Sequence, residues 1–418
     1  MFKKMPSKQK LGLVINSNMK MDVCGYWKNA RLDEIGEVIL GQSPPGETYN
    51  LEQEGLPFFQ GKAEFGDLYP TPIKWCSKPK KIAEPDDVLI SVRAPVGPTN
   101  LSPSRACIGR GLAAIRPKQG MPSKYLLYAL RATVDFLTEK ATGSTFEAIN
   151  GKDLKSHIIP VAPPYGQVRI VEEIEKQFTR LDAGIAALKR AQSNLKRYRA
   201  AVLKAACEGR LVESDVTKWK KVQLKEVIGS MKNGIYKPRS SYAERGVACL
   251  RMYNIENGKI VWKDIKRMNL SSKEIDEYQL LSGDLLVNRV NSRELVGKSA
   301  PILPGIEKCV FESKNIRIRL KHDLADYRFI GFVMSVYGPI HFSRNAQQVV
   351  GMASISQSQI GSIELSLPSL IEQKRIVAEV DRRLSVIEEL EALYVVNMKR
   401  ANRLRQAILQ SAFMGEQS

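Results

Sequence analysis

Apolar residues recur every three to four positions along two long stretches of the chain. In the first stretch, residues 167–212, they are Ile174, Leu181, Ile185, Leu188, Leu195, Tyr198 and Val202. In the second, residues 373–418, they are Val380, Ile387, Tyr394, Leu404 and Ile408. This spacing over several heptads predicts coiled-coil helices, and a lone helix of this length needs a partner to cover its apolar stripe. We therefore expect the two helices to pair with each other.

The two stretches are copies of one sequence at a constant offset of 206 residues. Gln167 and Ile170 recur as Gln373 and Ile376. The segments before them repeat as well, since Trp27-Lys28 matches Trp219-Lys220 at an offset of 192. Because the offset grows from 192 to 206, the second half has gained 14 residues before its helix and none within it. A fixed helix length between variable domains is what a spacer requires.

Local signals mark the ends of both helices. Ser369 and Glu372 have the spacing of a capping box at the start of the second helix, and Pro163-Pro164 precedes the first. Gly209 and Gly415 stand where a glycine commonly ends a helix.

The remaining sequence of each half predicts one compact domain of mixed helix and strand. Apolar or alternating runs predict strands at 87–92, 106–115, 284–287 and 313–320, and helical periodicity predicts helices at 124–140 and 325–337. We expect an α/β (α+β) fold with one twisted, antiparallel or mixed sheet per half. The predicted organisation is an arm at 1–24, a globular domain at 25–163, a helix at 164–213, a second domain at 214–367 and a second helix at 368–418.

Composition then narrows the class of partner and the compartment. The formal net charge is +20 and the hydrophobic fraction 43%, which favours a well-packed protein with a polyanionic partner such as nucleic acid. The six cysteines are scattered without CxxC spacing, so we expect no metal site and a reducing, cytoplasmic compartment. No apolar run approaches the ~20 residues of a membrane span, so we expect no membrane partner.

Three short motifs suggest catalysis and fail on inspection. Ala162-Pro-Pro-Tyr resembles the motif of amino-methyltransferases, but Ala162 lacks the side-chain oxygen that accepts the target amino group. Gly297-Lys298-Ser299 lacks the first glycine of a phosphate loop, because position 292 is serine. Asp86 and Asp87 lack the Glu-x-Lys of a nuclease, so a role at a turn or strand start is the better interpretation. We expect no catalytic site.

Loops beside the predicted strands carry side chains suited to DNA. Arginine, asparagine and glutamine form paired hydrogen bonds with base edges, and lysine and arginine neutralise phosphates. Arg93 and Arg289 stand out because both follow a predicted buried strand, although each residue alone also fits a solvated surface or structural role. The predicted DNA contacts are Gln60, Lys62, Arg93, Arg105, Arg110 and Thr145 in the first half and Arg251, Asn254, Arg289, Asn291, Arg293, Lys298, Arg344 and Gln347 in the second.

Taken together, the doubled motifs resemble the specificity subunit of type I restriction–modification enzymes. They are the two Trp-Lys…Leu-x-Glu segments, the two strand motifs ending at Arg93 and Arg289, Gln-x-Arg-Ile-Val at each helix start, and Arg-x-Ala-(Val/Ile)-Leu-x-x-Ala-x-x-Gly at each helix end. The second leader departs from the pattern, with Leu367-Pro368-Ser369 in place of a double proline, and Gly143-Ser-Thr-Phe146 has only a loose counterpart in Gly351-Met-Ala-Ser354.

The resemblance implies two target recognition domains that each read half of a split double-stranded DNA target, and an antiparallel coiled coil that sets their spacing. It implies two methyltransferase subunits docked on the helices, where Arg197, Arg199, Arg403 and Arg405 are candidates, and restriction subunits beyond them. S-adenosylmethionine, ATP and Mg²⁺ would belong to those partners, and this chain would bind no cofactor and catalyse nothing. The alternatives are a self-contained DNA methyltransferase or nuclease, an orphan specificity subunit of a methylation-only system, and a structural scaffold.

Overall fold

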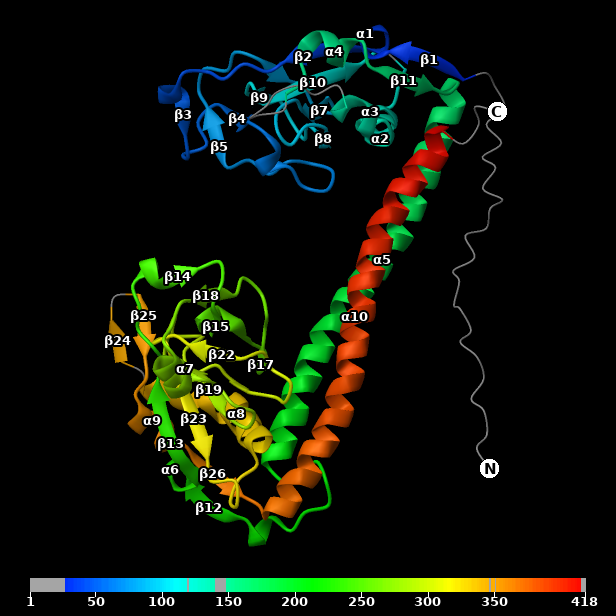
Figure 1. The fold of residues 1–418 in the computed structure, drawn as a ribbon. Helices are drawn as coiled ribbons and strands as arrows, with labels where there is room; N and C mark the ends of the chain where they lie inside the picture. Colours follow the sequence, from blue (N-terminus) through cyan, green and yellow to red (C-terminus); the bar gives the residue numbers. More distant parts are fainter. Residues whose placement is uncertain (1–26, 119, 140–147, 346, 350, 415–418) are drawn as a thin grey trace, which may run out of the picture. The chain divides into compact units, whose positions relative to one another are not determined.

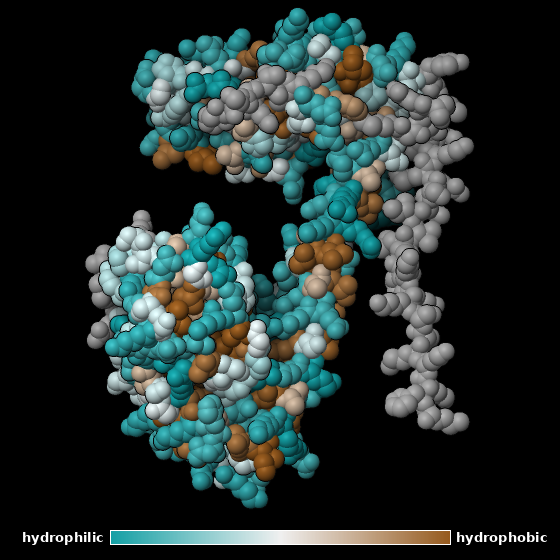
Figure 2. Space-filling model, viewed as in Figure 1, coloured by the Kyte–Doolittle hydropathy of each residue, from teal (hydrophilic) through white to brown (hydrophobic). Residues whose placement is uncertain are grey.

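The chain forms two compact units that each contain parts of both long helices (Figure 1). The structure is a computed structural model and describes residues 27–118, 120–139, 148–345, 347–349 and 351–414. Unit 1 comprises residues 1–187 and 397–418, and unit 2 comprises residues 188–396. The long helices are α5 (Pro164–Cys207) and α10 (Leu370–Met414). Figure 2 shows hydrophilic residues over most of the visible face of each unit.

The first globular domain contains three sheets among its described residues. Strand β1 (Lys28–Arg31) pairs antiparallel with β11 (Ile158–Val161), which brings both ends of the domain together just before α5. An antiparallel four-stranded sheet has the order β2 (Gly36–Leu40), β10 (Leu112–Pro117), β7 (Val88–Ser91), β8 (Thr99–Leu101). A five-stranded sheet has the order β3 (Tyr49–Asn50), β5 (Lys74–Cys76), β4 (Leu56–Phe59), β9 (Ala106–Ile108), β6 (Ile82–Ala83), with β4 and β9 parallel.

The second globular domain repeats this plan. Strand β12 (Lys220–Gln223) pairs with β26 (Glu364–Leu367), and a four-stranded sheet has the order β13 (Ile228–Asn233), β23 (Asn315–Leu320), β19 (Leu285–Asn288), β21 (Ser299–Pro301). Another has the order β14 (Tyr242–Ala243), β18 (Lys266–Met268), β15 (Val247–Leu250), β22 (Cys309–Phe311), with β15 and β22 parallel. Smaller sheets are formed by β16 (Ile255–Glu256) with β17 (Lys259–Ile260), and by β20 (Val290–Asn291), β25 (Met352–Ser354) and β24 (Gln347–Val349).

The prediction of one sheet per half was therefore wrong, and a glycine turn explains the difference. The predicted strand 106–115 is two strands, β9 and β10, which enter different sheets on either side of Gly109-Arg110-Gly111. A Cβ on Gly111 would lie 2.3 Å from the carbonyl oxygen of Gln60, so this turn requires a residue without a side chain. The predicted strands at 87–92, 284–287 and 313–320 are confirmed as β7, β19 and β23.

Helices cover the four-stranded sheets. The predicted helix 124–140 is split into α2 (Ser123–Ala132) and α3 (Val134–Thr138), and the predicted helix 325–337 continues to the end of α8 (Tyr327–Asn345). The short helices are α1 (Leu32–Ile35), α4 (Gly151–Lys155), α6 (Leu224–Val227), α7 (Ser272–Tyr278) and α9 (Gln357–Gly361), with 3-10 turns η1 (Gly46–Thr48), η2 (Lys62–Glu64), η3 (Val216–Lys218), η4 (Arg239–Ser241) and η5 (Met252–Asn254).

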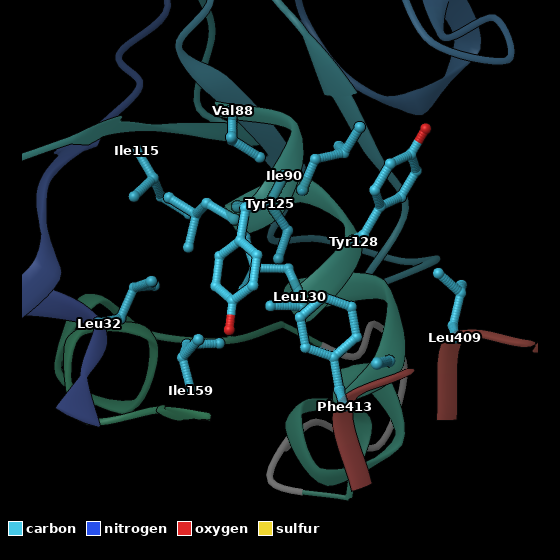
Figure 3. Packing of buried hydrophobic residues seen from close by; sticks show 14 of the residues in the cluster. Leu32, Val88, Ile90, Ile115, Tyr125, Tyr128, Leu130, Ile159, Leu409 and Phe413 are labelled. Carbon is cyan, nitrogen blue, oxygen red and sulfur yellow. The ribbon is translucent and has the colours of Figure 1, made fainter. Parts of the chain in front are cut away.

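The start of each long helix shares a hydrophobic core with the end of the other. In unit 1, Ile174 of α5 and Phe413 of α10 belong to one buried cluster with Tyr125 of α2, and the Tyr125 and Phe413 rings are 5.2 Å apart (Figure 3). In unit 2, Val380 of α10 and Cys207 of α5 lie in the equivalent cluster. Ile174 and Val380 are 206 positions apart, and so are Cys207 and Phe413. Equivalent residues of the sequence repeat therefore pack in equivalent clusters.

Ion pairs connect the two helices in each unit. Arg199 Nη2 lies 3.0 Å from Glu391 Oε2 in unit 2. In unit 1, Arg405 forms an ion pair with Asp182 and lies 4.7 Å from the centre of the Phe178 ring. Because residue numbers rise along α5 as they fall along α10, the helices are antiparallel, which confirms the predicted coiled coil. One residue of the predicted stripe, Tyr198, is 48% exposed and does not contribute to the buried seam.

The glycine stop signal predicted at the end of the first long helix is confirmed, but the helix is shorter than predicted. Helix α5 ends at Cys207, and Gly209 follows with a φ of +69°, while Arg210 N–H donates to Ala205 O at 2.9 Å. This is the Schellman arrangement that favours glycine, and the helix accordingly stops short of the predicted residue 212. Gly415 lies outside the described residues.

At the start of α10, Ser369 accepts the N–H of Glu372 at 3.3 Å, as predicted for a capping box. The carboxylate of Glu372, however, accepts from Trp219 Nε1 at 3.1 Å. Glu372 therefore connects the beginning of the second globular domain to the beginning of helix α10.

Candidate nucleic-acid interface

Three predicted DNA contacts meet at one corner of the first recognition domain. Gln60 follows β4, and Arg110 lies in the turn after its parallel neighbour β9. Gly109 N–H donates to Phe59 O at 2.8 Å, and Arg110 N–H donates to Ser43 Oγ at 3.3 Å. Lys62 begins η2 two residues after Gln60. We call Ser43, Gln60, Lys62 and Arg110 the first corner. Its Gln60, Lys62 and Arg110 are exposed, so amide and cationic groups face solvent together.

Backbone hydrogen bonds identify the equivalent corner of the second domain. Glu312 N–H donates to Leu250 O at 3.0 Å, as Gly109 N–H does to Phe59 O, so Arg251 stands in the place of Gln60. Ile235 N–H donates to Phe311 O at 2.9 Å, matching Gln42 N–H to Ile108 O at 3.0 Å. Tyr236 therefore stands in the place of Ser43.

The second corner consists of Tyr236, Arg251 and Tyr253. Tyr236 is 82% exposed and Tyr253 66% exposed. The Arg251 guanidinium lies 5.5 Å from the centre of the Tyr253 ring and donates to Asp264 O at 3.0 Å. Sequence reasoning missed both tyrosines, although an aromatic residue in the Gly-Ile-Tyr-Lys-Pro turn at 234–238 was an available signal. Planar, exposed side chains beside a cation suit contact with nucleotides.

The predicted equivalence of Arg93 and Arg289 is wrong by one residue. Val92 N–H donates to Gly111 O at 3.0 Å and Arg289 N–H donates to Lys314 O at 2.8 Å, so Arg289 occupies the place of Val92. Because side chains alternate across a strand, a shift of one residue turns a side chain to the other face. Arg93 is accordingly exposed, whereas Arg289 is half-buried and its Nε has no hydrogen-bond partner among the described residues.

Two predicted base contacts are structural residues instead. Asn254 is fully buried and its Nδ2 donates to Lys263 O at 2.9 Å, while its Oδ1 accepts from Arg251 N–H at 2.9 Å. Asn291 is also buried, and its Nδ2 donates to Asn288 Oδ1 at 2.7 Å. Their amides hold loops of the second domain in place, so the prediction that they read bases does not fit their burial.

The other predicted DNA contacts do not belong to either corner, and each has different neighbours. Arg105 forms an exposed ion pair with Glu84 at 3.2 Å, and Arg293 donates to Ser343 O at 3.1 Å. Lys298 is half-buried, and burial lowers the pKa of its amine, with a smaller opposite effect from Glu256. Arg344 is exposed near the end of α8, Gln347 lies in β24, and Thr145 lies outside the described residues.

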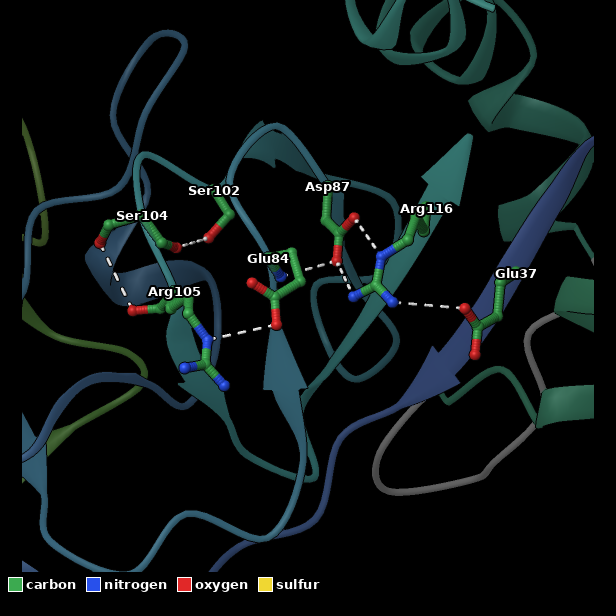
Figure 4. A network of polar contacts seen from close by, with 7 residues as sticks. All are labelled: Glu37, Glu84, Asp87, Ser102, Ser104, Arg105 and Arg116. Carbon is green, nitrogen blue, oxygen red and sulfur yellow. Dashed lines mark hydrogen bonds and ion pairs between the residues drawn. The ribbon is translucent and has the colours of Figure 1, made fainter. Parts of the chain in front are cut away.

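Asp87, one of the two candidate nuclease carboxylates, is engaged in the fold, and Asp284 is its counterpart in the second half. Asp87 is 2% exposed and accepts Arg116 Nη2 at 2.9 Å and Glu84 N–H at 2.8 Å (Figure 4). Asp284 repeats this arrangement with Arg319 Nε at 2.9 Å and Leu281 N–H at 2.9 Å. These contacts confirm the predicted role at a strand start.

Over the part of the chain that the structure describes, no three or more His, Cys, Asp or Glu residues are grouped so that they could hold a metal ion. Burial raises the pKa of the Cys107 and Cys249 thiols to about 12, which keeps them protonated and unreactive at neutral pH.

No described helix is both long and apolar enough to cross a membrane.

The four arginines predicted to dock partners fall into two classes. Arg197 and Arg403 are exposed at equivalent positions of α5 and α10. Arg199 and Arg405 instead form the ion pairs between the helices described above. Their guanidinium groups are engaged within the helix pair, and a docking role for these two arginines stays a prediction.

Comparison with known proteins identifies the repeated domain. The family model described as the type I restriction modification DNA specificity domain matches residues 25–194 and again residues 217–392. The specificity subunit of type I restriction enzyme MjaX from Methanocaldococcus jannaschii is 44% identical over 140 residues, which is 33% of each chain. The StySPI specificity subunit of Salmonella potsdam is 25% identical over 413 residues, covering 93% of this chain and 89% of that one.

A solved structure supports the fold. The HsdS subunit of Thermoanaerobacter tengcongensis matches with a TM-score of 0.54 at 19% identity, covering 93% of this chain and 97% of that one. With both family matches falling on the two recognition domains and the helices that follow them, the chain belongs to the type I restriction–modification DNA specificity family.

Proposed function

We propose that this chain gives a type I restriction–modification complex its DNA specificity, with each recognition domain reading one half of a bipartite target. The observation that carries the proposal is the pair of corners, which occupy the same place in a duplicated fold but differ in chemistry. The first offers Gln60, Lys62 and Arg110, and the second Tyr236, Arg251 and Tyr253. Equivalent positions with different side chains suit two different half-sites, and the net charge of +20 suits the phosphates between them.

The proposed partners are two adenine methyltransferase subunits and, beyond them, restriction subunits. A duplicated helix offers two equivalent docking surfaces, which suits two copies of one partner. The partners would bind S-adenosylmethionine, ATP and Mg²⁺ and carry out methylation and cleavage in the cytoplasm, while this chain would bind no cofactor and be no enzyme itself. The buried, ion-paired state of Asp87 and Asp284 supports a non-catalytic chain.

Methylome sequencing tests the proposal. A host with the chain and its methyltransferase is expected to carry N6-methyladenine in a two-part motif with a fixed unread spacer, and deletion of this chain should abolish that methylation. Methylation that persists without the chain would contradict the proposal. The rival reading, a self-contained methyltransferase, requires the purified chain to bind S-adenosylmethionine.

Arg110→Ala is expected to weaken binding of the assembled methyltransferase to its target about tenfold, because an exposed cation beside the duplex neutralises a phosphate. The slope of log affinity against log salt concentration should fall by about one. Filter binding over a salt series measures both. Arg31→Ala is the matched control, since Arg31 lies outside the predicted DNA contacts and is paired with Asp33 at 2.7 Å. A salt slope unchanged by Arg110→Ala would exclude a phosphate contact.

Charge reversal at the two exposed helix arginines tests the docking surfaces. Arg197→Glu and Arg403→Glu are each expected to weaken one methyltransferase site about tenfold, and together to prevent assembly of the complex with two methyltransferases. Native mass spectrometry reads the stoichiometry. Lys189→Glu, at another exposed position of α5, is the control for charge alone. Full occupancy in the double variant would place the docking surface elsewhere.

A further inference from the structure

A large cavity in unit 2 has in its wall one residue of the second corner, Tyr253, and one residue of the helix ion pairs, Arg199, while most of its lining belongs to neither. Its volume is about 1000 Å³, and it lies between the second half of α5, the β16–β17 hairpin, the segment before β21, and α8. That volume is at the upper end of the range for small-molecule sites. All the residues that line it belong to unit 2, so the cavity is a property of this unit alone.

Most of the wall is apolar. Leu203 of α5, Ile255 of the hairpin, and Met334 and Ile340 of α8 line it. Ile340 is among the exposed large hydrophobic residues of the chain. Exposed apolar surface within a concave site favours an apolar ligand, because its burial removes that surface from water.

Two hydrogen-bond donors, the Lys298 amine and the Ser299 hydroxyl, belong to the wall at the start of β21. Lys298 is half-buried there, and the next residue, Ser299, is 5% exposed with an Oγ that has no hydrogen-bond partner among the described residues. A buried hydroxyl without a partner costs free energy unless a ligand or water satisfies it. The adjacent amine and hydroxyl are both hydrogen-bond donors, and together they suit a carboxylate.

The balance of charge around the cavity is positive. Lys196, Lys204 and Lys298 line it together with Arg199, whose guanidinium is already paired with Glu391. Of the two lining carboxylates, Glu208 pairs with Lys204 of the wall at 3.9 Å and also with Arg210, which is not part of the wall. Glu256 is the other. Because cations outnumber carboxylates and only the Lys298 amine is half-buried, the cavity suits a ligand with a single negative charge. The apolar wall suits an apolar body on that ligand.

We propose that this cavity binds a small amphipathic monoanion, a carboxylate on an extended apolar body, with the carboxylate at Lys298 and Ser299 and the apolar body against Leu203, Leu295 and Ile340. Tyr253 belongs both to the cavity wall and to the second corner, so the bound anion would touch the residue that carries the DNA contact. Binding of the anion would therefore change the surface around Tyr253 in the second recognition domain. The proposal does not require an equivalent site in the first domain.

Isothermal titration calorimetry of the full chain with decanoate tests the proposal without any partner subunit or DNA. Saturable binding of one decanoate is expected, with decan-1-ol at least about tenfold weaker because it lacks the charge. Lys298→Met should weaken decanoate about tenfold and leave decan-1-ol unchanged. Lys314→Met, at an exposed position outside the cavity, is the matched control.

A second variant separates loss of the site from loss of the fold. Ala200→Phe adds bulk to the cavity wall from α5 and should weaken both probes, whereas Ala187→Phe, on the same helix outside the wall, should weaken neither. No saturable decanoate binding to the parent chain, equal affinity for the acid and the alcohol, or unchanged binding in both Lys298→Met and Ala200→Phe would each overturn the proposal. A failure here would leave the methylation pattern intact, so it is distinguishable from failure of the DNA-specificity function.

Discussion

Insertion of one heptad into each long helix is expected to move methylation to a target whose unread spacer is about three base pairs longer. Seven helical residues add about 10.5 Å, and a base pair adds about 3.4 Å along DNA. Seven residues are close to two whole turns, so the apolar face of each helix keeps its direction. The original target should lose its methylation, while both half-sites keep their sequence, because the recognition domains are untouched.

The insertion sites follow from the two ion pairs that fix the register. Asp182 pairs with Arg405 and Arg199 with Glu391, so insertions after Arg190 of α5 and after Met398 of α10 lie between the paired positions of each helix. Duplicating residues 184–190 and 392–398 keeps the apolar pattern. Methylome sequencing of the variant reads the spacer.

An insertion in one helix alone is the control. It makes the two helices unequal in length, so the ion pairs and the shared cores cannot all form, and methylation should be lost rather than moved. Methylation by the doubly inserted chain at the original spacer would show that the helices do not set the distance.

The long helices were predictable from sequence because their pattern depends on neighbouring residues and occurs twice in the chain. Period, length and stop signal are properties of neighbouring residues, and an offset of 206 held without a gap from Gln167 to Gly209. That the two helices pair followed from the need to cover an apolar stripe, whereas their antiparallel direction was implied by the family resemblance. The exposure of Tyr198 could not be foreseen, because which apolar residues of a stripe face the partner depends on the crossing of two helices.

The corners were only partly predictable, because they are made by strands far apart in sequence. Gln60 and Arg110 are 50 positions apart and meet through the parallel pairing of β4 with β9. The error at Arg93 and Arg289 has the same origin: both follow a buried strand, but the pairing partner decides the register and hence the face. Asn254 shows a further limit, since the same amide suits a base edge or a buried loop and composition does not separate them.

Arg319→Ala is expected to destabilise the second recognition domain by about 3 kcal/mol, the lower end of the cost of removing one partner of a buried ion pair. Asp284 is 3% exposed, and without Arg319 its charge would keep only the Leu281 N–H at 2.9 Å. The lower end applies because the Arg319 side chain is itself 36% exposed. Hydrogen exchange followed by mass spectrometry should show lost protection in β19 and β23 and unchanged protection in β7 and β10.

The duplicated fold supplies matched comparisons for this prediction. Arg116→Ala should produce the mirror result, with protection lost around Asp87 and retained in the second domain, because Asp87 is buried in the same way. Arg105→Ala removes an exposed pair with Glu84 and should cost less than about 1 kcal/mol. Adding Asp284→Ala to Arg319→Ala should restore part of the stability, since no buried charge is then left unpaired. If Arg319→Ala cost no more than Arg105→Ala, the buried carboxylate would not be what holds the start of β19 in place, and the conserved geometry of the two domains would need another cause.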